Sequence, residues 1–350
     1  MHDYIIVGCG LAGIAFAEKA LQNSKSIIVI NNQSQNASKV AGGLYNPVVL
    51  KRFSQVWNAN EQLELLDVFY SDLEKKLKIK LDYKLPLLRK FYSIEEQNNW
   101  FIASDKPNLS NFLSTKLIFQ NFKFVTSPYG FGEVLYSGYI DTQLLVNEYQ
   151  NYLKQLNLYL EESFNHSLLQ VEADFVTYKN YKARHIVFAE GFGMLLNPFF
   201  TSLPLDGTKG ELLIIRAPNL DFNVILKTSI FVVPLGSDLY KVGATYNWDD
   251  KSNAPTDVAK LELIDNLKDL IACDFEIVEH RAGVRPTVKD RKPLVGTHYQ
   301  YKNVHLLNGL GTRGVMLAPA MARDLYNLIE HKIQLDMNVD IRRIKNYGKF

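Results

Sequence analysis

The feature that most constrains the fold is a glycine-rich turn between two buried-strand patterns near the N-terminus. Glycines stand at Gly8, Gly10 and Gly13, directly after the apolar run Tyr4–Val7, and a helical pattern follows to about residue 21. A second apolar run, Ile27–Ile30, completes a strand–helix–strand unit. In this context the glycines allow a tight turn, let the backbone approach a pyrophosphate and let the helix pack close to the strand. The pattern therefore predicts a dinucleotide site at the positive end of the helix.

The residue that ends the second predicted strand bears on how the nucleotide is held. In units of this kind an acid roughly twenty residues past the glycines accepts hydrogen bonds from the ribose hydroxyls. Here the strand ends in Asn31, followed by Asn32. An asparagine carbonyl oxygen can accept one such bond, but it carries no charge that would repel a 2′-phosphate. Asn31 is therefore a candidate ribose contact, and the alternative is that it merely begins a loop.

Length and composition are those of an ordinary globular chain. At about 150 residues per domain, 350 residues predict roughly two domains. Hydrophobic residues make up 47% of the chain and charged residues 22%, which argues against disorder and coiled coil. The net charge is +2 and the basic runs are short, so a small-molecule partner is expected rather than nucleic acid.

The sequence also bears on location and on metal content. No window approaches eighteen uninterrupted apolar residues, and the N-terminus lacks the basic flank of a signal peptide, so we expect neither a membrane span nor export. The two cysteines, Cys9 and Cys273, lie far apart, which indicates a reduced, cytoplasmic chain. No metal-ligand spacing of His or Cys and no Gly-x-Ser-x-Gly motif occurs, so metal hydrolase and serine hydrolase functions are rejected.

The remaining patterns predict several helices and a cluster of strands. Amphipathic helices are expected at about 61–77, 141–156, 256–271 and 317–329, with Asp141 and Thr256 as N-caps. Strand-like runs cluster at 212–215, 230–233 and 239–244, whereas 186–189 and 304–307 stand alone. The cluster predicts an antiparallel sheet in an inserted domain. We expect a discontinuous nucleotide-binding domain of residues 1–85, 140–205 and 283–350, and a substrate-binding domain of residues 86–139 and 206–282.

Three further segments rich in small residues could bring backbone N–H groups to a cofactor. The first runs from Ser38 through Ala41 to Gly43, the second is Ala189–Gly191, and the third is Gly309–Gly314. The third precedes a predicted helix, whose first N–H groups favour a partial negative charge. Taken one at a time, any of them could be a simple turn.

With their neighbours, these segments resemble the D-amino-acid oxidase family of FAD enzymes, in its glycine oxidase and sarcosine oxidase branch. The matching motifs are Ala41–Pro47, Val187–Gly191, Ala282–Gly296 and Asn308–Pro319, in the family's order over nearly the whole chain. The Gly-x-Arg-Pro-x-x-x-Asp and Arg-Gly-x-x-x-Ala-Pro elements are the most specific. The resemblance implies an α/β fold with a Rossmann-like FAD-binding domain and an inserted antiparallel-sheet substrate domain, as in glutathione-reductase-type flavoproteins.

The resemblance also implies FAD, held without a covalent bond. Some sarcosine oxidases attach the flavin to a cysteine near the arginine motif, and no cysteine lies close to Arg285. In the family the loop at Gly42 lies beside the isoalloxazine ring, and the Gly309–Gly314 loop lies at the pyrimidine end of the flavin. The full set of expected FAD contacts is Gly8, Gly10, Leu11, Ala12, Gly13, Asn31, Asn32, Ser38, Ala41, Gly42, Gly43, Ala189, Gly191, Gly309, Gly311, Thr312, Arg313, Gly314 and Val315.

Two arginines carry the prediction about the substrate. A buried guanidinium needs a partner, and a carboxylate offers two oxygens that match its fork of donors. Arg285 and Arg313 match arginines at the substrate site of glycine oxidase-like proteins, where the first holds the carboxylate. The alternatives are an internal ion pair with Asp290 or a surface charge.

The resemblance supplies the rest of the expected substrate pocket. It would be floored by Leu44 and walled by Phe231 and Tyr246. Relatives commonly carry a tyrosine at the position of Phe231, whose hydroxyl helps to hold the substrate. That hydroxyl is absent here, and Tyr246 is the candidate replacement, so the substrate can differ from plain glycine.

The function implied is oxidation of the C–N bond of a small amino acid or N-substituted amino acid, by hydride transfer from its α-carbon to the flavin and hydrolysis of the resulting imine. No obligatory catalytic base is identifiable. Two alternatives remain open. One is an oxidase that acts on a carboxymethylaminomethyl group of modified tRNA, since the chain also resembles the oxidase domain of a bacterial wobble-uridine-modifying enzyme. The other is a non-catalytic dinucleotide-binding module.

Overall fold

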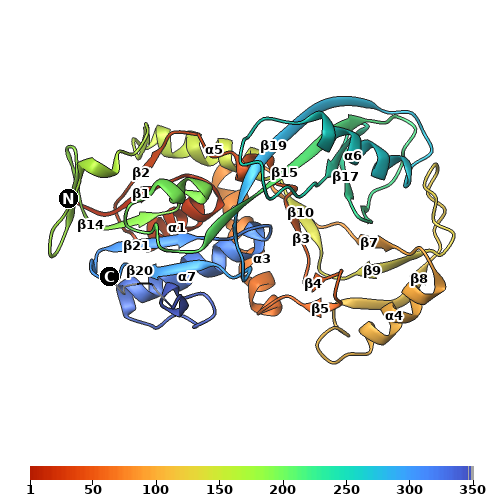
Figure 1. Cartoon of the computed structure of the whole chain (residues 1–350), viewed down its shortest axis with the longest axis horizontal. Helices are drawn as coiled ribbons and strands as arrows, with labels where there is room; N and C mark the ends of the chain where they lie inside the picture. Colours follow the sequence, from red (N-terminus) through yellow and green to blue (C-terminus); the bar gives the residue numbers. More distant parts are fainter. Residues whose placement is uncertain (346, 348–350) are drawn as a thin grey trace.

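The computed structural model describes residues 1–345 and residue 347, and its centre is a sheet of mainly parallel strands. β1 is flanked by parallel β2 and β14, and the parallel strands β11 and β21 lie outside these two. This sheet occupies one half of the molecule, with both marked chain ends beside it (Figure 1). Its strands are β11 (Tyr159–Glu161), β2 (Ile27–Asn31), β1 (His2–Val7), β14 (Tyr181–Phe188), β13 (Val176–Tyr178), β12 (Leu169–Val171), β21 (Val304–Asn308) and β20 (Leu294–Thr297).

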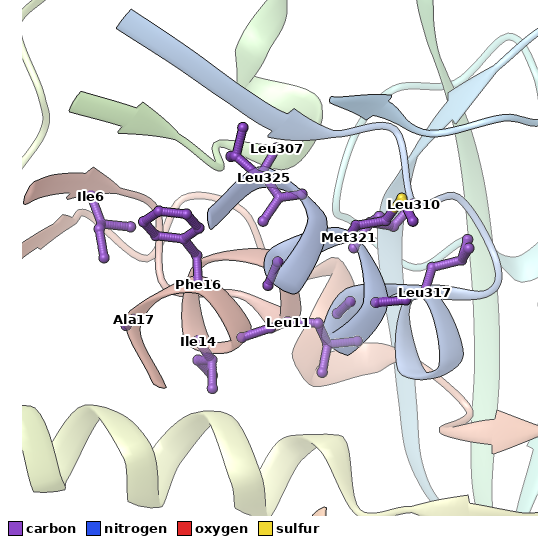
Figure 2. Close-up of a cluster of buried hydrophobic side chains, with 14 of the residues drawn as sticks. Ile6, Leu11, Ile14, Phe16, Ala17, Leu307, Leu310, Leu317, Met321 and Leu325 are labelled. Atoms are coloured by element: carbon purple, nitrogen blue, oxygen red, sulfur yellow. The ribbon is translucent and has the colours of Figure 1, made fainter. Parts of the chain in front are cut away.

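Two helices that are far apart in sequence pack together on this sheet and form the main core. Leu11, Ile14 and Phe16 of one helix join Leu317 and Met321 of the other in a single buried cluster, as Figure 2 shows. The first helix follows β1 and the second follows β21, so the core joins an early and a late segment of the chain. The helices of the structure are α1 (Leu11–Gln22), α2 (Ala37–Val40), α3 (Ala59–Leu77), α4 (Ile94–Ser104), α5 (Thr142–Gln155), α6 (Asp257–Lys268) and α7 (Gly314–His331).

The other half of the molecule is built on a second sheet of eight strands (Figure 1). It is antiparallel except where β16 runs parallel to β7. Its order is β19 (Glu276–Val288), β15 (Leu205–Arg216), β18 (Leu239–Gly243), β17 (Phe231–Gly236), β16 (Ile225–Lys227), β7 (Leu87–Lys90), β9 (Phe131–Val134) and β8 (Leu113–Ile118). Two small sheets consist of β3 (Leu44–Tyr45), β10 (Gly138–Ile140) and β6 (Asp82–Tyr83), and of β4 (Val48–Val49) and β5 (Ser54–Gln55).

The mixed α/β fold and the antiparallel second sheet agree with the sequence prediction. Asp141 and Thr256 are confirmed as N-caps, because their side chains accept the N–H groups of Leu144 and Ala259. The last predicted helix begins three residues earlier than expected, at Gly314. The two runs predicted to stand alone are parallel neighbours in the first sheet, as β14 and β21. The domain limits stay a prediction, and one continuous strand, β19, crosses the expected limit between residues 282 and 283.

A histidine pair, of which His305 is buried and His185 partly buried, gives the fold a predicted dependence on pH. His305 Nε2 lies 3.1 Å from His185 Nδ1, and Thr297 Oγ1 lies 2.9 Å from the other ring nitrogen of His305. Burial lowers the pKa of His185 from 6.5 to about 4 and the pKa of His305 well below its usual value. Because both pKa values are depressed in the folded state, this stability is present above pH 6.5 and is lost as the pH falls toward 4.

We therefore expect the free energy of unfolding to fall by about 3 kcal/mol between pH 7 and pH 4 through His185 alone. Chemical denaturation at a series of pH values measures this dependence. His185→Gln should flatten the curve, whereas the same change at the exposed His331 should leave it unaltered. Parallel curves for the parent and His185→Gln would contradict the assignment.

Candidate functional site

The turn after β1 can adopt its path only with glycine at two positions. Gly8 has a φ of +102°, and a Cβ added there would lie 2.3 Å from the carbonyl oxygen of Ala189. A Cβ at Gly13 would lie 2.0 Å from the carbonyl oxygen of Gly8, so the start of α1 packs tightly against the turn. Gly10 is the N-cap of α1; it has no side chain to cap the helix, and no acid lies in the first turn. The positive end of α1 is therefore available to an anionic ligand.

A second helix start lies directly beside the first. α7 begins after Arg313 and also has neither a side-chain cap nor an acid in its first turn. A Cβ added to Gly314 would lie 3.1 Å from Leu11 Cδ1, which places the two helix starts in contact. Nearby, Gly191 and Gly311 both have positive φ and would meet no atom within 4 Å if they carried a Cβ. Glycine backbone thus borders open space beside two helix starts whose own N-cap residues form no capping bond.

Hydrogen bonds connect the loops that border this space. Asn308 Nδ2 donates to the carbonyl oxygen of Gly191 at 2.9 Å, and Gly311 N–H donates to the carbonyl oxygen of Pro286 at 3.0 Å. Ser38 Oγ accepts from Leu11 N–H at 3.0 Å, so the small-residue loop after β2 also reaches the start of α1. The loops at Ser38, Gly191 and Gly311, which were expected to contact FAD, therefore lie around the start of α1 and beside one another. Thr312 is exposed, whereas Val315 is buried in the helix core.

Asn31 lies at the end of β2, as expected, and its side chain is engaged within the protein. Its Oδ1 accepts from the backbone N–H of Cys9 at 3.3 Å, and its Nδ2 donates to the hydroxyl of Tyr159 at 3.0 Å. Asn32 Nδ2 donates to Ser163 Oγ at 3.1 Å. Asn31 thus ties the glycine turn to β2 and β11.

We expect Asn31→Ala to weaken FAD binding by about 1 kcal/mol, the usual value of one neutral hydrogen bond. The lost bond is either the predicted ribose contact or the one that holds the Cys9 turn. Titration of apoprotein with FAD, followed by quenching of flavin fluorescence, measures the change. Asn23→Ala is the control, since Asn23 caps the far end of α1. Unchanged affinity for FAD would show that Asn31 has no part in cofactor binding and only joins β2 to its neighbours.

The small-residue loop and Phe231 form one side of the candidate substrate site. A Cβ added to Gly42 would lie 2.6 Å from Phe231 Cζ, and one added to Gly243 would lie 2.7 Å from the same atom. Phe231 and Leu44 belong to the same hydrophobic cluster. The predicted floor and one predicted wall therefore lie together beside the loop that carries Gly42 and Gly43.

The Arg285 guanidinium is hydrogen-bonded to backbone carbonyl groups. Its Nη1 donates to the carbonyl oxygens of Thr245 at 3.2 Å and of Lys209 at 3.4 Å. Its guanidinium carbon is 4.6 Å from the ring centroid of Tyr246, which is 61% exposed. Gly210 makes room for the guanidinium, because a Cβ there would lie 1.8 Å from Arg285 Nη2.

Arg285 does not form an ion pair with Asp290, the acid in the same sequence motif. Asp290 pairs with Arg343, at 3.1 Å from its Nε. Within residues 1–345, neither Arg285 nor Arg313 forms an ion pair with a carboxylate. Burial lowers the pKa of both arginines, and Tyr246 lies near enough to both guanidiniums to oppose that effect. Two desolvated cations without a carboxylate partner favour an anionic ligand.

Sequence reasoning missed several residues that shape the site. Tyr159 holds Asn31, Asn308 joins two loops, and Lys209 contributes a carbonyl oxygen to Arg285. Each acts on a partner far away in the sequence, so no local pattern marks it. In the described part of the chain, no group of three or more acids, histidines or cysteines is arranged to hold a metal ion. Nor does that part contain a helix with the length and apolar character needed to cross a bilayer.

Comparison with known proteins agrees with this geometry. The sequence profile of a family described as FAD dependent oxidoreductase matches residues 3–328, and the chain belongs to that family. A glycine oxidase of Bacillus subtilis is 29% identical over 225 residues, which cover 59% of this chain and 60% of that protein. A glycine oxidase of Pseudomonas aeruginosa is 28% identical over 39% of this chain and 38% of its own length. The matches thus span 60% or less of these curated relatives.

Solved structures show the same fold at low identity. Glycine oxidase from Geobacillus kaustophilus has a TM-score of 0.77 at 18% identity and covers 96% of both chains. L-amino acid deaminase from Proteus vulgaris, without its specific insertion, has a TM-score of 0.77 at 16% identity, over 98% of this chain and 94% of that one.

The cofactor of the family fits the residues of this site. FAD is the cofactor, and its anionic pyrophosphate suits the open, positively polarised start of α1. Gly10, Gly191 and Gly311 leave the space that side chains would otherwise fill. The protein is therefore an FAD-dependent oxidoreductase.

Proposed function

We propose that this enzyme oxidises the C–N bond of a small amino acid or N-substituted amino acid. The observation that carries the proposal is Arg285, a half-buried guanidinium that bonds backbone carbonyls through Nη1 and pairs with no carboxylate of the described residues. Its Nη2 and Nε would bind the two oxygens of the substrate carboxylate, with Arg313 as a second cation nearby. The names of the glycine oxidase and amino acid deaminase relatives support this substrate class.

The residues of the chain would act by binding, orientation and exclusion of water. When bound, FAD would supply the electron sink for the hydride of the substrate's α-carbon. Arg285 would fix the carboxylate, and the buried Phe231 would keep the reacting end of the substrate in an apolar environment. The two guanidiniums would also favour the neutral form of the amine, because a third positive charge beside them is costly. An amine that binds in its neutral form has no ammonium proton to lose, so no side chain would need to act as an obligatory base.

The two alternatives from the sequence receive less support. The net charge of +2 gives little attraction for tRNA, and the family assignment speaks for an enzyme rather than a passive binding module. Both cysteines are free thiols, which supports the expected cytoplasmic location.

The test is anaerobic titration of the purified holoenzyme with glycine, sarcosine and a panel of other amino and N-methyl amino acids. Bleaching of the flavin absorption band identifies a substrate directly. If dithionite bleaches the flavin and no amine or amino acid does, the proposed reaction is wrong.

The flavin should be held without a covalent bond. Cys9 is buried in the glycine turn, and Cys273 packs against the core of the second sheet, so neither thiol is placed for attachment near Arg285. We expect acid precipitation to release all of the yellow colour into the supernatant as FAD, which chromatography would identify. Flavin that remains with the precipitate would contradict this prediction.

A further inference from the structure

Lys209 is a fully buried lysine in the second sheet, on the strand next to the edge strand β19. It lies on β15 at 0% exposure. Residues paired across antiparallel strands point to the same face, and Lys209 pairs with Val284 whereas Arg285 pairs with Thr208. The Lys209 side chain and the Arg285 side chain therefore leave the sheet on opposite faces. No motif suggested a role for Lys209.

The ammonium group of Lys209 holds one segment at several points. Nζ donates to Asp250 Oδ2 at 2.5 Å, to Ser252 Oγ at 3.2 Å and to the carbonyl oxygen of Ala254. All three acceptors belong to the connection between β18 and α6. This contact holds the pKa of the Asp250 carboxyl at about 2. A buried ammonium is tolerated because each of its donors has an acceptor.

Glu211, two residues further along β15, holds the end of the same connection. Its carboxylate accepts from Thr256 N–H at 2.8 Å and from Thr256 Oγ1 at 2.9 Å, and it lies 3.4 Å from Lys209 Nζ. His280 Nε2 lies 2.9 Å from the same carboxylate. Lys209 and Glu211 thus form a buried charge cluster behind the sheet.

The backbone of the same connection faces the candidate substrate site. Lys209 and Asn247 exchange two backbone hydrogen bonds, at 2.8 and 2.9 Å. Thr245 supplies the carbonyl oxygen nearer to Arg285 Nη1, and Tyr246 lies over the guanidinium. Residues 245–256 therefore contact Lys209 behind the sheet and Arg285 in front of it.

We propose that Lys209 is a positioning residue that fixes segment 245–256, so that the Thr245 carbonyl and the Tyr246 ring orient the guanidinium of Arg285 toward the substrate carboxylate. This inference rests on the proposed function. Lys209 acts through the segment and does not touch the substrate. Its loss would leave Glu211 buried without its cation and would release Asp250, Ser252 and Ala254 together.

The test compares Lys209→Met with the parent holoenzyme. Methionine keeps the length and apolar stem of lysine but has no donor. Hydrogen–deuterium exchange should show at least tenfold faster exchange at residues 245–256, and titration with benzoate should show at least a tenfold higher dissociation constant. FAD content should stay at the parental level, since no expected FAD contact lies in the segment.

Two further variants separate positioning from general stability. Lys90→Met removes another buried lysine of the same sheet, which is 5% exposed and donates to the carbonyl oxygen of Asp269. It should leave benzoate binding within twofold of the parent, whatever its effect on the melting temperature. Asp250→Asn changes a partly exposed side chain, so the fold should survive, and it should produce a smaller change of the same kind as Lys209→Met.

The outcomes are distinct. The inference is overturned if exchange at 245–256 stays unchanged in Lys209→Met and Asp250→Asn, or if exchange rises while benzoate binding does not change. If the parent itself binds no carboxylate and oxidises no amino acid, the proposed function fails. In that case the exchange result still shows whether Lys209 orders the segment.

Discussion

Gly10→Val should fold and purify without colour. A Cβ at Gly10 already lies 2.8 Å from Ser38 Oγ, and the valine methyl groups would extend over the uncapped start of α1. That space is where the FAD pyrophosphate is expected, and a branched side chain there excludes it. Because Gly10 has an ordinary extended φ of −88°, valine adds no left-handed strain and the loss should concern the cofactor.

The ratio of flavin to protein absorbance measures this loss, and circular dichroism reports whether the fold is retained. We expect less than a tenth of the parental FAD content. Gly193→Val serves as the control, because a Cβ there meets its nearest neighbour, Gln35, at 3.6 Å, an ordinary contact distance. Full FAD content in Gly10→Val would show that the cofactor does not approach this turn.

Arg285→Lys should abolish most carboxylate binding while leaving FAD content near normal. The arginine donates to the Thr245 carbonyl through Nη1, and within the described residues its Nη2 and Nε form no hydrogen bond, so we expect these two donors to bind the ligand. A lysine ammonium is a point charge that cannot reproduce this fork, and removing one partner of a desolvated charge pair costs on the order of 2 to 5 kcal/mol. At the lower limit this corresponds to roughly a thirtyfold increase in the dissociation constant.

Perturbation of the flavin spectrum by acetate and benzoate gives the dissociation constants, and competition with substrate checks that they bind at the same place. Arg281→Lys is the matched control. Arg281 lies on the same strand and points to the same face, but it pairs with Glu279 and bonds Gln143. If Arg285→Lys binds carboxylates and turns over amino acids as the parent does, the arginine is structural and the substrate class loses its main support.

The parts of the fold that could be predicted from the sequence are those formed by residues close together in the chain. The β1–α1–β2 unit follows from apolar runs and glycines within about thirty residues. The caps at Asp141 and Thr256 follow because a cap bonds a backbone group three residues ahead. Such features depend on local geometry, which a single sequence contains.

What could not be predicted depends on pairing over long distances. The second sheet gains β7, β8 and β9 because β16 pairs with β7, from which it is separated by more than a hundred residues. Asn31 is held by Tyr159, and the expected partner of Arg285, Asp290, pairs with Arg343. In each case several partners were chemically equivalent, and only the folded chain determines which one comes near.

The Phe231 ring is held between Gly42 and Gly243, and this packing restricts which substitutions the three positions can accept. The ring tip occupies the volume that a side chain at either glycine would need. A larger residue at position 42 or 243 is therefore compatible only with a smaller one at position 231, and the effect of each change depends on the others. A relative that carries a side chain at position 42 or 243 should therefore also carry a smaller residue at position 231.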